Sequence, residues 1–99
     1  MYLIVYHISD NNTRTKTADR LLEWGFERIQ YSVFIGTENP AEIKELWDTL
    51  KHYLQTENNP EDKLFAIAID KQHFKNMKII GNNTLDMDYL MGETDTLII

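Results

Sequence analysis

Three side chains that could do chemistry follow the first apolar segment of the chain, in the stretch YLIVYHISDNN. His7 could act as a general acid or base or bind a metal, and Asp10 could recruit a metal from the loop. Ser9 has no neighbouring base that would make it a nucleophile, so we expect it to be a loop residue that contacts phosphate. Structural roles are preferred for both charged positions, because His7 can close a strand at a dimer contact and Asp10 can cap a helix.

Arg14, Lys16 and Arg20 form a local cluster of positive charge just beyond this loop. We expect the cluster at the start of a helix, where free backbone amides and the helix dipole also favour an anion. The chain as a whole has a formal net charge of -6, so any contact with nucleic acid must be local. The cluster therefore predicts binding to a phosphate backbone, and its structural alternative is a solvated helix face.

The composition is that of one globular domain spanning residues 1–99. Hydrophobic residues make up 42% and charged residues 26% of the 99 residues, which is typical of a folded chain. The absence of cysteine excludes disulfides and thiolate zinc sites and favours a cytoplasmic location. The first apolar segment is too short to span a membrane and lacks the features of a secretion signal, so we expect no membrane association. His52 and His73 lie among polar residues and are expected at the surface.

The elements that must position these side chains alternate between strands and helices. Apolar and β-branched runs, helix caps and Gly25 as a helix terminator define them, and we expect both tryptophans, Trp24 and Trp47, in the core. The expected elements are a strand over 2–8, a helix over about 13–24, two strands within 26–36 that meet near 30–32, a helix that begins with the capping box Asn39, Pro40 and Glu42 and continues to about 54, and a strand over 63–69. This order predicts an α+β, ferredoxin-like βαββαβ sandwich with both helices on one face.

The segment from about 77 to 99 is left over once this four-stranded sheet is complete. It contains two short apolar pieces, MKIIG and the terminal TDTLII, separated by a polar, turn-rich stretch. Such pieces usually pair at a sheet edge, and an exposed edge favours pairing with a second chain. We therefore expect this extension to pair with a partner subunit.

Several segments together resemble a known family. YLIVYHISDN, GFERIQYSVFIG and NPAEI, with RTK and LL between the first two, are similar to the small CRISPR-associated adaptation protein, the partner of the CRISPR integrase in spacer acquisition. The resemblance covers nearly the whole chain and is densest over 6–11 and 28–36. It implies a ferredoxin-like homodimer that exchanges its C-terminal strand between subunits.

The same resemblance implies a magnesium site that this chain has altered. Many members are described as magnesium-dependent endonucleases whose metal is held on the dimer axis by an aspartate in the first strand, in the motif YDI. The matching residue here is His7. Magnesium prefers carboxylate and water oxygens, whereas imidazole suits zinc, copper, nickel or iron. The substitution thus argues against strong magnesium-dependent nuclease activity.

Three functions remain open on these grounds. The preferred one is an adaptation subunit with little or no activity of its own, a dimeric platform that binds duplex DNA and bridges integrase subunits. The alternative is a metal-dependent endonuclease on RNA or DNA that works through His7 and Asp10. A small-ligand regulatory module is the third, because ferredoxin-like domains host many unrelated functions.

Overall fold

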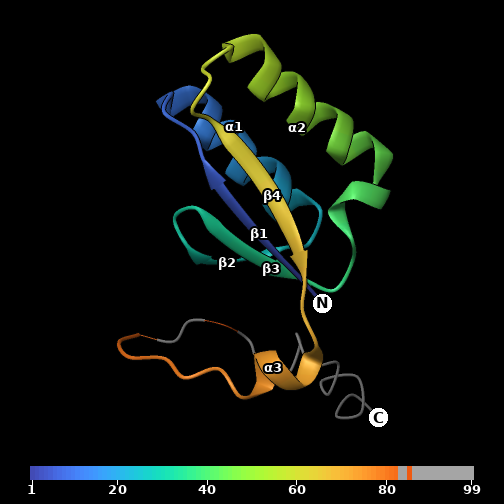
Figure 1. Cartoon of the computed structure of the whole chain (residues 1–99), viewed down its shortest axis with the longest axis vertical. Coiled ribbons are helices and arrows are strands. Elements are labelled where there is room, and N and C mark those ends of the chain that lie inside the picture. The colour runs from blue at the N-terminus through green and yellow to red at the C-terminus, as the bar shows by residue number, and fades with distance from the viewer. Residues whose placement is uncertain (83–84, 86–99) are drawn as a thin grey trace.

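The structure, a computed structural model, describes residues 1–82 and Leu85 and contains one four-stranded antiparallel sheet. The strand order is β2-β3-β1-β4, and two helices cover one face of the sheet (Figure 1). The elements are β1 (Tyr2–His7), α1 (Asn11–Glu23), β2 (Glu27–Gln30), β3 (Val33–Gly36), the 3₁₀ turn η1 (Pro40–Glu42), α2 (Lys44–Glu57), β4 (Lys63–Ala68) and α3 (Lys71–Lys75). The βαββαβ prediction is confirmed. The proposed exchange of a C-terminal strand concerns residues 94–99, which lie outside the described residues.

β1 is the central strand because it bonds to a neighbour on each side. Ile4 is opposite Phe34 of β3 and Ala66 of β4, and all three side chains lie on the face toward the helices. Ile4 and Phe34 are fully buried there, and they form the centre of the core with Leu21 of α1 and Leu50 of α2. This core fixes the direction in which β1 leaves the sheet, and so places the loop that follows it.

Three local predictions need correction. α1 begins at Asn11, two residues earlier than expected, because Asp10 caps it. Asn39 does accept a hydrogen bond from the Ala41 amide, but Pro40 starts a separate 3₁₀ turn, and α2 begins only at Lys44 because Ile43 is extended. Trp24 is 41% exposed rather than in the core, since it follows the last turn of α1. Gly25 then reverses the chain with φ of +88°, as expected for a helix terminator.

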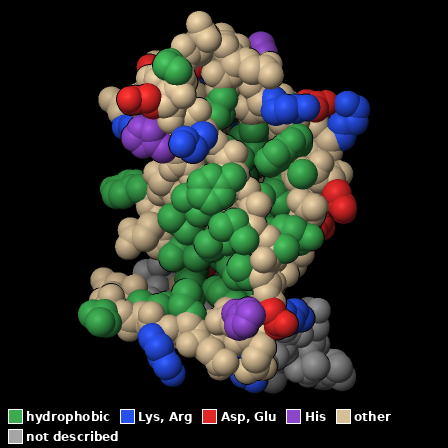
Figure 2. Space-filling view, in the orientation of Figure 1, with side chains coloured by type: hydrophobic (Ala, Val, Ile, Leu, Met, Phe, Trp, Pro, Cys, Tyr) green, Lys and Arg blue, Asp and Glu red, His purple; other side chains and the backbone are tan. Residues whose placement is uncertain are grey.

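The described residues cover the second face of the sheet only in part. α3, which the sequence did not lead us to expect, is capped by Asp70 and buries Phe74 against Ile35 and the neighbouring Leu3. Residues 77–81 form no strand within this single chain, and Met77 packs in the same cluster; the expected pairing of this extension with a partner subunit stays a prediction. Over the rest of this face Phe65 and Ile67 of β4 are each 44% exposed. Figure 2 shows hydrophobic side chains gathered over the middle of the molecule.

Within the described residues, no helix is long and apolar enough to cross a membrane.

Candidate nucleic-acid interface

His7 is the last residue of β1 and lies exposed opposite Lys63 of β4. Because side chains alternate along a strand, it lies on the same face as Leu3 and Val5, away from the helices. We call residues 7–10 the mouth of β1. Its first residue therefore faces the partly covered side of the sheet, while the chain continues toward α1.

Asp10 is the N-cap of α1, so its structural interpretation is confirmed. The carboxylate accepts hydrogen bonds from the backbone amide of Thr13 at 2.9 Å and from the Thr13 hydroxyl at 3.0 Å. The bond from the Thr13 amide is the main reason that the pKa of Asp10 lies below its usual value, and the hydroxyl bond adds to it. The carboxylate is thus ionised and already satisfies the start of the helix.

Two acidic side chains from the α2–β4 region hold the mouth of β1. Asp62 accepts from the Ser9 amide at 3.1 Å and from the Ser9 hydroxyl at 2.9 Å, and Glu57 accepts from the Asp10 amide at 3.0 Å. Ser9 thus spends both of its donors within the protein. The predicted loop position of Ser9 is confirmed, and its expected contact with phosphate stays a prediction.

Glu57 and Asp62 also form a carboxyl pair. The Oε2 atom of Glu57 is buried without a donor, and a hydrogen bond with Asp62 forms only when one of the two carries a proton. That bond, followed by desolvation, raises the pKa of Glu57. Desolvation also acts to raise the pKa of Asp62, but bonds from Glu57 and Ser9 outweigh it, and the net effect lowers this pKa. When the pair carries one proton, that proton is therefore favoured on Glu57.

These residues do not fit a magnesium ion. The Asp10 carboxylate is bound to Thr13, and His7 offers an imidazole where a hard cation needs charged oxygens. No cluster of three or more His, Asp or Glu side chains suited to a metal occurs in the described part of the chain. Ser9 and Asp10 thus spend their hydrogen bonds within the protein, and the mouth of β1 anchors α1.

The positive cluster on α1 divides between two sides of the helix. Lys16 and Arg20 are four residues apart and share one side, whereas Arg14 is two residues before Lys16 and points elsewhere. The expectation that all three lie at the start of the helix is wrong for Arg20, which is in the last turn. The division decides what each cation can reach.

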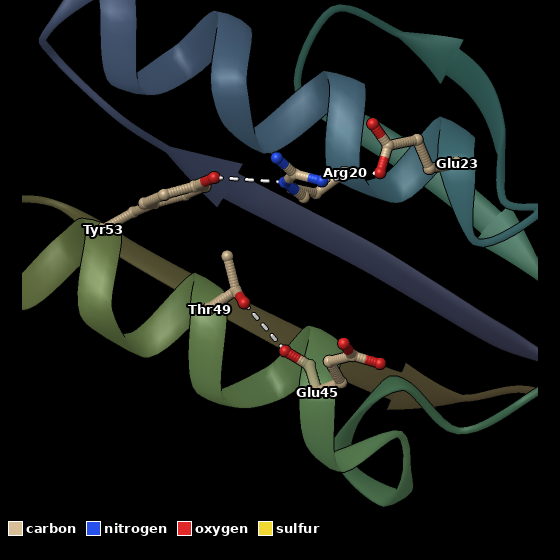
Figure 3. A network of polar contacts seen from close by, with 5 residues as sticks. All are labelled: Arg20, Glu23, Glu45, Thr49 and Tyr53. Atoms are coloured by element: carbon tan, nitrogen blue, oxygen red, sulfur yellow. Dashed lines mark hydrogen bonds and ion pairs between the residues drawn. The ribbon is translucent and has the colours of Figure 1, made fainter.

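Lys16 and Arg20 both turn toward Tyr53 of α2. Lys16 lies over the Tyr53 ring, 5.8 Å from its centroid, and Arg20 donates from Nε to the Tyr53 hydroxyl at 3.2 Å. Arg20 also pairs with Glu23 at 2.7 Å (Figure 3). The bond to Tyr53 and then the charge of Glu23 raise the pKa of Arg20. Arg20 therefore links the two helices, and Glu23 offsets its charge.

Arg14 lies instead on the side of α1 that faces Arg28 of β2 and the turn after it. Arg14 donates from Nη1 to the Ile8 carbonyl at 3.0 Å and from Nη2 to the side chain of Asn11. A cleft of about 590 Å³ opens here, lined by Arg14, Thr15, Asp19, Arg28, Tyr31 and Ser32 together with Ala18. We call it the arginine cleft. With two guanidinium groups and one carboxylate among its lining side chains, it has a net positive charge.

Arg28 is held in place by the turn that it borders. Its Nη2 donates to the Tyr31 carbonyl at 3.0 Å, and its guanidinium lies 5.3 Å from the centroid of Tyr31 and 5.2 Å from that of Phe34. Its Nε is buried and has no acceptor among the described residues. A fixed guanidinium at the edge of an open cleft is suited to an anionic ligand.

Tyr6 of β1 also holds the β2–β3 turn in place. Its hydroxyl donates to the Tyr31 carbonyl at 3.0 Å, so that this carbonyl accepts two bonds, one from Tyr6 and one from Arg28. Burial raises the pKa of Tyr6, although a hydrogen bond with Arg28 and the nearby charges of Arg28 and Arg14 act against it. Tyr6 thus remains a neutral donor.

Sequence reasoning missed Arg28. Its position opposite Phe34 places a charged residue on the face of β2 that turns toward the helices. The alternation of inward and outward side chains along the strand could have given this signal. It places the charge of Arg28 at an inward position, three residues before Tyr31 in the turn.

The fold and this cleft define a small ferredoxin-like protein with a positively charged cleft beside α1. Residues 1–77 match the family described as CRISPR associated protein Cas2, and the chain belongs to this family. The resemblance identified in the sequence is therefore confirmed.

Named relatives agree with this assignment. A CRISPR-associated endoribonuclease Cas2 of Pyrobaculum aerophilum is 46% identical over 59 residues, which cover 59% of this chain and 65% of the relative. One from Francisella tularensis subsp. novicida is 37% identical over 90 residues, covering 82% of this chain and 93% of the relative. A Cas1/Cas2 endonuclease fusion of Thermoproteus tenax is 42% identical over 59 residues, covering 59% of this chain and 22% of the fusion.

Proposed function

We propose that the chain is a CRISPR adaptation subunit, a homodimeric platform that binds duplex DNA and bridges integrase subunits during spacer acquisition. The observation that carries the proposal is the arginine cleft, which presents two anchored guanidinium groups on an otherwise acidic chain. Guanidinium groups bind phosphate through paired hydrogen bonds as well as charge. Arg14 and Arg28 are the main phosphate contacts, with Lys16 and Arg20 contributing along α1.

Two further observations support the partners. The Thermoproteus tenax relative joins a Cas1 endonuclease and a Cas2 endonuclease in one chain, which supports association with Cas1. Phe65 and Ile67 leave an apolar patch on the sheet that a second copy of the chain would cover. In this dimer the terminal TDTLII pairs with the sheet of the other subunit.

A metal-dependent endonuclease is the second candidate, because the relatives from Pyrobaculum and Francisella are named endoribonucleases. The residues at the mouth of β1 do not suit magnesium, which places this candidate second. The regulatory-module alternative rested on the fold alone, and membership of the Cas2 family removes that reason for it.

The proposal is tested by the salt dependence of duplex DNA binding, measured by fluorescence anisotropy. Arg14→Ala/Arg28→Ala is compared with Lys16→Ala/Arg20→Ala, a control that removes the same charge from the other side of α1. The arginine-cleft variant should lose the larger part of the affinity and flatten the salt dependence by about one unit per lost phosphate contact. Equal affinity in the cleft variant and the native protein would refute the proposal.

A further inference from the structure

Tyr31 presents an aromatic ring to solvent at the rim of the arginine cleft. Its side chain belongs to a residue that is 80% exposed, the most exposed large aromatic among the described residues. An isolated exposed tyrosine needs no explanation, because apolar atoms make up much of any protein surface. The surroundings of this ring are what distinguish it.

The backbone of Tyr31 is fixed while its ring is left uncovered. Its carbonyl accepts from the Tyr6 hydroxyl and from Nη2 of Arg28, both at 3.0 Å. The Arg28 guanidinium lies over the ring, 5.3 Å from the centroid, and is itself packed against buried Phe34. The ring is therefore supported on one side by a cation that the core holds in place.

We infer that Tyr31 is a stacking platform for an unpaired base of a nucleic acid whose phosphates lie in the arginine cleft. This inference rests on the proposed function and adds a ligand class, single-stranded or frayed nucleic acid, to the same surface. Aromatic side chains stack on every base without reading its sequence, and adjacent cations bind the backbone. Arg28 places both functions within reach of a single nucleotide.

The geometry favours an unpaired base over an intact duplex. In a duplex both faces of an internal base are already stacked, so that an aromatic ring can reach a base only where the pairing has opened. Asp19 on the wall of the cleft disfavours a second phosphate close to it, and Arg14 and Arg28 remain the sites for the backbone. A strand end that leaves the duplex near Tyr31 satisfies both conditions.

The experiment compares three DNA probes on the full chain: a short single strand, a blunt duplex, and the same duplex with an unpaired tail. Tyr31→Ala should weaken binding of the single strand and the tailed duplex by about 5- to 100-fold. Binding of the blunt duplex should weaken far less, because the variant keeps the backbone carbonyl that anchors Arg28. Tyr31→Phe keeps the ring and should bind all three probes as the native protein does.

Trp24→Ala is the matched control, since Trp24 is also an exposed aromatic residue but lies outside the arginine cleft. It should leave all three affinities unchanged. Tyr31→Trp gives a second measurement, because stacking of a base should quench the introduced fluorescence with the single strand and not with the blunt duplex.

Two results would overturn the inference: unchanged binding of the single strand by Tyr31→Ala, or an equal loss on all three probes. Neither result would contradict the proposed function if Arg14→Ala/Arg28→Ala still bound the blunt duplex more weakly than the native protein does. Weaker binding of only the single strand and the tailed duplex by Tyr31→Ala would support Tyr31 as the stacking platform. Failure of the native protein to bind any probe would refute the proposed function and the inference together.

Discussion

The mouth of β1 and the arginine cleft both gather polar side chains beside the start of α1, yet they use their hydrogen bonds differently. At the mouth, Ser9 and Asp10 are bound by Asp62, Glu57 and Thr13. In the cleft, Arg28 is anchored but keeps a buried donor without an acceptor. The anchored guanidinium groups of Arg14 and Arg28 line an open cleft of net positive charge, which suits an anionic ligand.

The comparison shows that residue type is a poor guide to function when partners are ignored. His7, Ser9 and Asp10 have the chemistry of an active site, yet Ser9 and Asp10 use their hydrogen bonds to anchor α1. Arg28 looks like an ordinary strand residue in the sequence. Variants in the two regions should therefore differ in kind: changes at the mouth should alter stability, and changes in the cleft should alter binding.

The largest effect should come from Arg28→Ala set against Asp62→Ala. Losing Arg28 should reduce duplex affinity about tenfold or more, because charge-assisted hydrogen bonds to phosphate are lost. Asp62→Ala removes the acceptor of Ser9 and should lower the melting temperature with little change in affinity. Anisotropy and thermal unfolding on the same samples would separate the two outcomes. A large loss of affinity in Asp62→Ala would show that the mouth of β1 also takes part in binding DNA.

A smaller effect is expected at the helix cap. Asp10→Ala should lower the melting temperature by several degrees, since Thr13 loses its acceptor, whereas Asp10→Asn should be nearly neutral because asparagine caps a helix equally well. The pair of variants separates capping from charge. Equal destabilisation by both variants would show that the negative charge of Asp10, rather than its hydrogen bond, matters.

A smaller effect again should appear in the pH dependence of stability. Because the pKa of Glu57 is raised in the folded protein, Glu57 adds to the free energy of unfolding. This stabilisation is complete below the pKa of Glu57 in the unfolded chain and is lost as the pH rises through its folded pKa. Because the pKa of Asp62 is lowered in the folded protein, Asp62 stabilises the fold above its unfolded pKa. This stabilisation is lost as the pH falls through its folded pKa. The pair is therefore most stabilising in the acidic interval between the two folded values, with His7 and Asp10 as its charged neighbours.

Glu57→Gln tests this dependence. Glutamine can accept from the Asp10 amide and donate to Asp62 at any pH, so it mimics the protonated pair. Melting temperatures are measured from acidic to neutral pH. The melting temperature of the variant should equal that of the native protein at acidic pH and be slightly higher at neutral pH. A difference that stays constant with pH would contradict the shared proton.

The sequence predicted the fold because its signals were local and agreed with one another. Apolar runs located β1 and β4, Gly25 ended α1, and the polar centre of FERIQYSVFIG separated β2 from β3. It failed where tertiary contacts decided the outcome. α3 forms where Phe74 can pack on the far face of the sheet, and no periodicity over five residues announces such a helix.

The candidate site was predicted only in part, for a geometric reason. Helical spacing can separate Arg14 from Lys16 and Arg20, but it cannot show that Arg14 meets a residue of β2 fourteen positions later. That meeting depends on how the β2–β3 turn packs beside α1. Asp62 and Glu57 likewise reach the mouth of β1 only through the paired ends of β1 and β4.

The smallest expected effect is the loss of magnesium-dependent cleavage when His7 is removed, because the native protein should have little to lose. A neutral imidazole supplies no negative charge to a hard cation and a protonated one repels it, while the Asp10 carboxylate is committed to Thr13. The native protein, His7→Asp, His7→Ala and Asp10→Asn should be assayed on short RNA and duplex DNA, with magnesium, manganese or a chelator. Robust cleavage by the native protein that the chelator and His7→Ala both abolish would show that the mouth of β1 is a catalytic site after all. Activity gained only by His7→Asp would mean that β1 still has the geometry of the metal site that the resemblance implies and lacks only its carboxylate. The arginine cleft would then be the surface that this chain has kept for nucleic acid.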